Sequence, residues 1–172
     1  LRAPSPASKV LWEIEGKRLR RSAERYLPHW QKFVAPWLEQ KVTPRPHHFE
    51  ASFGLPPGNE GPSAAPLILC VDGVEVRIGG RIDRVDVAEI EGGFGFWIID
   101  YKTGSSSRYT GGDLQEFKKL QLTLYALAVE SVLFAGQSAR PLGLAYWLVT
   151  DTGPKTVMPG SRQPTTWLHE VG

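Results

Sequence analysis

The segment that most constrains the fold is Phe94–Tyr101, an apolar stretch whose single charged residue is Asp100. Aromatic and branched side chains follow one another here, so both faces of an extended chain would be apolar. Strands of this kind lie inside sheets that are covered on both sides. We therefore expect Phe94–Tyr101 to form a buried central strand that ends at Asp100.

Turn signals divide the preceding residues into further strands. Leu67–Val71 and Val74–Ile78 flank Asp72-Gly73, a dipeptide typical of a two-residue hairpin. Arg81–Val87 continues as an extended segment, and Glu91-Gly92-Gly93 turns the chain back into the central strand. These signals predict an antiparallel meander.

Helices and shorter strands are expected on either side of the meander. A proline-rich loop over residues 43–66 contains one short strand, His48–Phe53, and Leu142–Thr150 is the last clear strand. Asp113, with an acid three residues later, resembles a capping box and predicts a helix that ends at Gly136. The expected order is one helix, the meander, a second helix and a strand.

The charge is concentrated near the N-terminus. The total of +2 divides into +6 for residues 1–47 and −4 for the remainder. An apolar stripe predicts a helix there, which we expect Pro28 to kink or split; the stripe consists of Leu19, Ala23, Tyr26, Trp30, Phe33 and Trp37. The basic residues off this stripe form either a solvated face or a surface for nucleic-acid phosphates.

One acid–lysine pair stands out chemically. Of four Asp/Glu-x-Lys triplets, only Asp100-Tyr101-Lys102 ends a predicted buried strand, where side chains two residues apart share a face. A turn near Gly92 would bring Asp83, on the preceding strand, close to Asp100. Two carboxylates and a lysine favour either a site for a hard cation such as Mg²⁺ or a salt-bridged strand end.

The second predicted helix offers further polar groups. Gln121 and Tyr125 are four residues apart and Lys118 is one turn earlier, so all three share a face. Gln121 either points towards the acid–lysine site or is a partly buried polar residue on a core helix.

Three motifs in this order resemble the PD-(D/E)XK nuclease superfamily, and within it the RecB/AddB-type branch. They are Gly80-Arg-Ile-Asp-Arg-Val-Asp86, Ile99-Asp-Tyr-Lys-Thr-Gly104 and Leu120-Gln-Leu-Thr-Leu-Tyr125. The resemblance covers about Phe49 to Thr150. It implies an α/β fold with a restriction-endonuclease-like αβββαβ core, in which helices flank a mixed central sheet.

The resemblance also implies roles for individual residues. Metal ligands would be Asp83, Asp100 and the backbone carbonyl of Tyr101, and the cofactor would be Mg²⁺ or Mn²⁺. Lys102 would be the catalytic lysine, assisted by Gln121. Contacts to DNA would come from Arg81, Arg84, Lys118 and Tyr125, and Glu50 matches an acid on the family's first strand.

One family feature has no match in the chain. Members usually carry a histidine ligand on an early helix, and His29, His47, His48 and His169 all lie in other contexts. We expect that helix to precede Leu1, in a longer polypeptide. Some relatives hold an iron–sulfur cluster with four cysteines, and Cys70 alone does not suffice, so we expect no cluster in this chain.

The implied function is metal-dependent DNA cleavage by a single domain over residues 1–172. Its parts would be a basic helical arm (1–42), the proline-rich loop (43–66), a catalytic core (67–150) and a tail (151–172). We expect an exonuclease on single-stranded DNA in repair, recombination or defence, with a helicase domain or helicase protein as partner. The alternative is a catalytically incomplete module that binds DNA or scaffolds a helicase–nuclease complex. No apolar run is long enough for a membrane span, and we expect a cytoplasmic protein.

Overall fold

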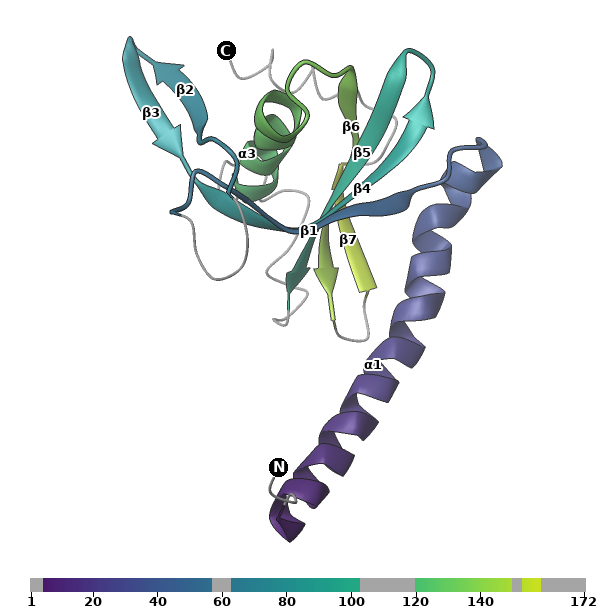
Figure 1. The fold of residues 1–172 in the computed structure, drawn as a ribbon. Coiled ribbons are helices and arrows are strands. Elements are labelled where there is room, and N and C mark those ends of the chain that lie inside the picture. The colour runs from purple at the N-terminus through teal and green to yellow at the C-terminus, as the bar shows by residue number, and fades with distance from the viewer. Residues whose placement is uncertain (1–4, 57–62, 103–119, 150–152, 159–172) are drawn as a thin grey trace.

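The computed structural model describes residues 5–56, 63–102, 120–149 and 153–158, which form a mixed α/β fold (Figure 1). In chain order the elements are α1 (Pro6–Glu39), β1 (Arg45–Phe53), β2 (Leu67–Val71), β3 (Val74–Ile78), β4 (Gly80–Ile90), β5 (Gly93–Lys102), α3 (Gln121–Ala128), the π-helix η2 (Val129–Leu133), β6 (Ala139–Leu148) and β7 (Gly153–Met158). None of the described helices is long and apolar enough to cross a membrane.

Five strands form one mixed sheet in the order β1-β4-β5-β6-β7, and β2 and β3 form a separate hairpin. β5 pairs with β6 in parallel, whereas the other neighbours in the sheet are antiparallel. The helical connection through α3 and η2 supplies the crossover that parallel neighbours require. The expectation of a mixed sheet with Phe94–Tyr101 in a central strand is therefore confirmed.

The predicted hairpin at Asp72-Gly73 is also confirmed. Both residues have positive φ angles, 51° and 77°, as a two-residue turn with the right-handed twist of its strands requires. Leu67 pairs with Ile78 and Val71 with Val74, so the strands have the boundaries that the sequence indicates.

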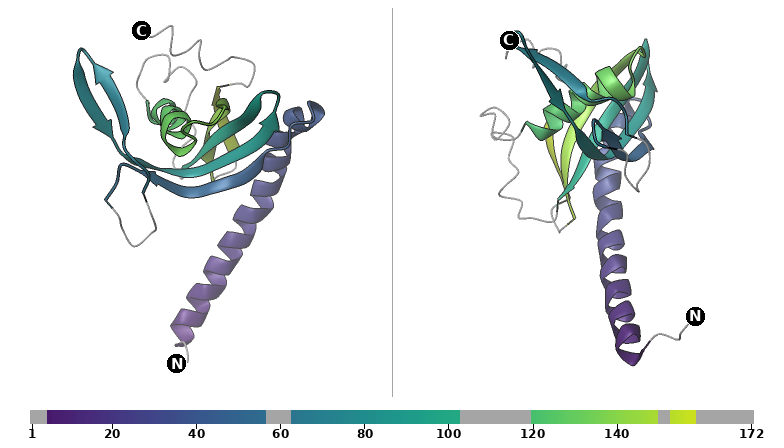
Figure 2. Two further views of the ribbon diagram at one scale, coloured as in Figure 1. Left: turned by 45° about the horizontal axis from the view of Figure 1, so that its top comes forward. Right: turned by 60° about the vertical axis from the view of Figure 1, so that its left-hand side comes forward.

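Helices cover both faces of the sheet around β5 (Figure 2). Phe96 and Ile98 belong to the hydrophobic core that includes Leu122 of α3. Trp97, between them in sequence, faces the other way and meets Trp37 of α1 with ring centroids 5.0 Å apart. The apolar character of both faces of β5 thus reflects two separate layers of helix.

Helix α1 runs unbroken through Pro28 and Pro36, so the expected split at Pro28 does not occur (Figure 1). Aromatic packing on both sides of the proline explains this, because Tyr26 and Trp30 both lie against Trp147 with centroids 4.8 and 6.0 Å apart. The helix has two contrasting halves. Its C-terminal half packs on the sheet, whereas every residue from 9 to 25 is exposed.

The structure extends the sequence-based boundaries in two places. β1 begins at Arg45, three residues before the predicted strand. β7 lies in the tail, for which the sequence predicts no strand, and it contains Pro154. It is an edge strand that pairs only with β6, and an edge tolerates the missing amide of a proline. The predicted helix start at Asp113 lies outside the described residues.

Candidate functional site

The candidate site lies where β4 and β5 diverge. Their ladder runs from Ile90, paired with Gly93, to Arg84, paired with Ile99. Beyond this point β5 continues beside β6, while β4 turns away with β1 (Figure 1). The amide of Tyr101 donates instead to Asp83 Oδ2, 2.7 Å away, so a carboxylate replaces the next backbone acceptor.

Asp100 is a buried and incompletely bonded carboxylate. It is 2% exposed, and its Oδ2 forms an ion pair with Lys102 Nζ but accepts no hydrogen bond from the described residues. Burial raises the pKa of Asp100; Lys102 acts against this, and the negative charge of Asp83 adds to it. The predicted proximity of Asp83 and Asp100 is thus confirmed, and the pair favours a nearby cation.

Lys102 is linked to α3 by a short polar chain. Its Nζ donates to Gln121 Oε1 at 3.3 Å, and Gln121 Nε2 donates to the hydroxyl of Tyr125 at 3.0 Å. The structure therefore brings Gln121 and Tyr125 to the acid–lysine pair, one of the two alternatives that the sequence left open. Lys118, predicted on the same helix face, lies outside the described residues.

The oxygen donors here fit a hard divalent cation. Asp83 and Asp100 contribute carboxylates, the ligands that Mg²⁺ and Mn²⁺ prefer. In an extended chain the amide and carbonyl of one residue face the same neighbouring strand, so the carbonyl of Tyr101 faces the side of Asp83. The part of the chain that the structure describes contains no group of three or more His, Cys, Asp or Glu suited to a metal. Water and substrate oxygens would complete such a coordination shell.

Glu50 does not join the two aspartates. Its neighbours Phe49 and Ala51 pair with Arg84 and Ile82, which places Glu50 at the level of Asp83. However, Glu50 has a φ of 51°, and its exposed side chain lies 3.8 Å from Arg81 Nη1. Glu50 and Arg81 therefore form a surface pair beside the site, from which Arg81 remains accessible to a ligand.

The structure places Arg84, a predicted DNA contact, inside the protein. It is 5% exposed, and its guanidinium forms a two-pronged ion pair with Asp86, with N–O distances of 2.6 and 2.8 Å. We therefore do not retain Arg84 as a phosphate contact. The signal was present in the sequence, because Arg84 and Asp86 are two residues apart on a strand and must share a face.

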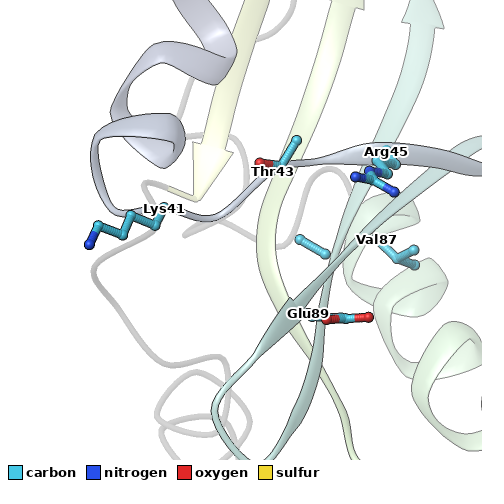
Figure 3. Close-up of a pocket in the computed structure, with 6 residues that line it drawn as sticks. Lys41, Thr43, Arg45, Val87 and Glu89 are labelled. Atoms are coloured by element: carbon cyan, nitrogen blue, oxygen red, sulfur yellow. The ribbon is translucent and has the colours of Figure 1, made fainter.

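A separate hollow of about 380 Å³ lies near the opposite end of β4 from Asp83 (Figure 3). It is lined by Lys41, Thr43, Arg45, Val87, Ala88 and Glu89. None of the site residues predicted from sequence lies among them.

Comparison with known proteins gives consistent matches. The family model described as the PD-(D/E)XK nuclease superfamily matches residues 3–170. An ATP-dependent helicase/deoxyribonuclease protein of Caldanaerobacter subterraneus subsp. tengcongensis is 33% identical over 147 residues, which cover 81% of this chain and 12% of that protein. The protein of the same name from Pelotomaculum thermopropionicum is 30% identical over 159 residues, 88% of this chain and 13% of that protein. The chain thus spans about an eighth of the length of these relatives.

Proposed function

The chain belongs to the PD-(D/E)XK nuclease superfamily, and on this basis we propose that it is a metal-dependent deoxyribonuclease that hydrolyses phosphodiester bonds. The observation that carries the proposal is the buried Asp100, with an oxygen that accepts no hydrogen bond, beside Asp83 and Lys102. A purely structural ion pair would satisfy that oxygen.

Each residue of the site has a distinct part in the proposed reaction. Asp83 and Asp100, with the carbonyl of Tyr101, hold the divalent ion, Mg²⁺ or Mn²⁺, which when bound supplies a water of lowered pKa. Lys102 orients the attacking water and stabilises negative charge on the phosphorus oxygens. Gln121 fixes the ammonium of Lys102 through the 3.3 Å hydrogen bond.

The N-terminal half of α1 is the proposed path for the DNA backbone. Trp37 faces Trp97, and Tyr26 faces Trp147, which is in register with Tyr101, so α1 runs opposite to β5. Its exposed N-terminal half consequently projects past the edge at which β5 ends (Figure 1). This half carries Lys9, Lys17, Arg18, Arg20, Arg21 and Arg25. Such cations hold phosphates by salt-dependent contacts, and Arg81 would add one beside the site.

Several finer points also belong to the proposal. We propose a single nuclease domain over residues 1–172, an exonuclease on single-stranded DNA that acts in the cytoplasm during repair or recombination, with a helicase as partner. Tyr125 and Lys118 would contact the DNA near the site. The names of the relatives refer to both a helicase and a deoxyribonuclease, which is the basis for the partner.

One observation favours a second candidate, a nuclease-like module that binds DNA without cleaving it. The described residues supply two carboxylates and no third protein side chain for a metal. Retention of both aspartates together with Lys102 and Gln121 favours the enzyme.

A cleavage assay on labelled single- and double-stranded DNA with Mg²⁺ or Mn²⁺ tests the proposal. We expect Asp100→Ala and Lys102→Ala to lower the rate by at least about 100-fold, the usual size of acid–base and electrostatic contributions. Glu39→Gln is the matched control, because Glu39-Gln40-Lys41 has the same spacing on an exposed segment. Cleavage that survives both site variants would disprove the assignment, and DNA binding without cleavage by the wild type would select the second candidate.

A further inference from the structure

A second polar cluster lies directly behind the candidate site, on the face of the sheet covered by α1. We propose that Arg84 is a positioning residue, which holds Tyr101 against α1 and thereby fixes the backbone between Asp100 and Lys102. This inference rests on the proposed function of the site, and it assigns to α1 a part in the site's geometry.

The guanidinium of Arg84 contacts groups from four elements. In addition to Asp86, its Nη1 donates to the hydroxyl of Tyr26 on α1 at 2.5 Å and to the hydroxyl of Tyr101 on β5 at 3.2 Å. The ring of Trp30 lies against it, with the guanidinium carbon 4.4 Å from the ring centroid, and the ring of Phe49 on β1 lies 5.8 Å away. A planar fork in this setting fixes direction as well as charge, which makes lysine a poor substitute.

Tyr101 connects this cluster to the catalytic side. Its hydroxyl accepts from Arg84, while its backbone amide donates to Asp83. Since side chains alternate along a strand, Asp100 and Lys102 point to the opposite face from the ring of Tyr101. One residue therefore links the Arg84 cluster to the spacing of both carboxylates and the lysine.

The cluster behaves as a fixed support across the physiological range. Burial, together with the neighbouring Tyr101, raises the pKa of Tyr26 to about 12. Although burial opposes it, Asp86 and Tyr101 raise the pKa of Arg84 above its ordinary value. The hydroxyl of Tyr26 consequently stays neutral and the guanidinium stays charged, so the hydrogen bonds of Arg84 persist.

Helix α1 closes the cluster from outside. Tyr26 packs against Trp147, and the register of β6 puts Trp147 beside Tyr101. The same turn of α1 leads into the exposed basic half of the helix. The point at which α1 anchors to the sheet is therefore the point that supports Tyr101.

Hydroxyl deletions test the proposal without disturbing the packing. Tyr101→Phe and Tyr26→Phe keep the rings but remove the acceptors of Arg84. We expect Tyr101→Phe to weaken Mn²⁺ binding, measured by isothermal titration calorimetry, and to lower kcat by about tenfold each, with KM for DNA unchanged. Tyr26→Phe, one contact further away, should give the same pattern with a smaller change.

Trp37→Phe is the matched control, since Trp37 anchors α1 to Trp97 at a distance from Arg84. It should lower the thermal midpoint of unfolding and leave the Mn²⁺ dissociation constant and kcat unchanged. Wild-type values in both tyrosine variants would overturn the proposal. If the wild type binds Mn²⁺ but does not cleave, the proposed function fails while the calorimetry still decides on Arg84. A wild type that binds no Mn²⁺ overturns both.

Discussion

Two acid–base pairs lie back to back in this sheet, one on each face. Arg84–Asp86 on β4 faces α1, and Lys102–Asp100 on β5 faces α3. In each pair the partners are two residues apart, and the carboxylate is at most 2% exposed. Burial raises the pKa of Asp86 and of Asp100 alike. Neither burial nor spacing therefore separates a structural pair from a reactive one.

Hydrogen bonding does separate them. Both oxygens of Asp86 accept from Arg84, whose remaining donors reach Tyr26 and Tyr101. Asp100 Oδ2, by contrast, accepts no hydrogen bond from the described residues, and a second carboxylate lies near it. A complete set of bonds stabilises one arrangement, whereas an incomplete set leaves a demand that a cation and a substrate can meet.

The largest effect on stability is expected from breaking the complete pair. Asp86→Asn leaves the buried guanidinium of Arg84 without its counter-charge and should lower the free energy of unfolding by about 3–5 kcal/mol. Urea denaturation followed by tryptophan fluorescence would measure this. A loss under about 1 kcal/mol would mean that the two pairs do not differ as described.

The same change in the incomplete pair should have little effect on folding. Asp100→Asn removes a buried charge that Asp83 repels, so we expect the free energy of unfolding to change by no more than about 1 kcal/mol. Mn²⁺ binding, followed by calorimetry, should be lost in this variant. Retained Mn²⁺ binding would contradict the assignment of Asp100 as a ligand.

Glu130 offers the mildest comparison, as a half-buried carboxyl for which the described residues supply no ion pair. Burial raises its pKa, so the folded protein binds this proton more tightly than the unfolded chain, and its contribution to stability falls as pH rises from about 4.5. Glu130→Gln should therefore flatten the decline of the thermal midpoint between about pH 4.5 and 7. An unchanged slope would show that Glu130 is solvated in the folded state.

Local patterns predicted the parts of this molecule that local geometry controls. The positive φ preference at Asp72-Gly73 fixed one hairpin, and the turn at Gly92 brought Asp83 to Asp100. Strand alternation placed Lys102 beside Asp100, and helical spacing directed Gln121 towards Lys102.

Long-range contacts account for the rest. Arg84 depends on Tyr26, 58 residues earlier in the chain, and no local pattern indicates that hydrogen bond. The continuity of α1 through Pro28 comes from packing on Trp147, and β7 exists because β6 offers it an edge. In each case tertiary contacts outweighed a local preference against the structure.

The tight turn between β4 and β5 also has a consequence for the order of folding. Only Glu91 and Gly92 separate the two strands, so a hairpin that contains both aspartates closes on the microsecond scale typical of local pairing. The parallel pairing of β5 with β6 needs a much longer loop and is slower. We expect the acidic pair to assemble early and to wait for Gln121 and the second layer of helix, so the nascent hairpin carries its charge repulsion before the rest of the protein compensates it.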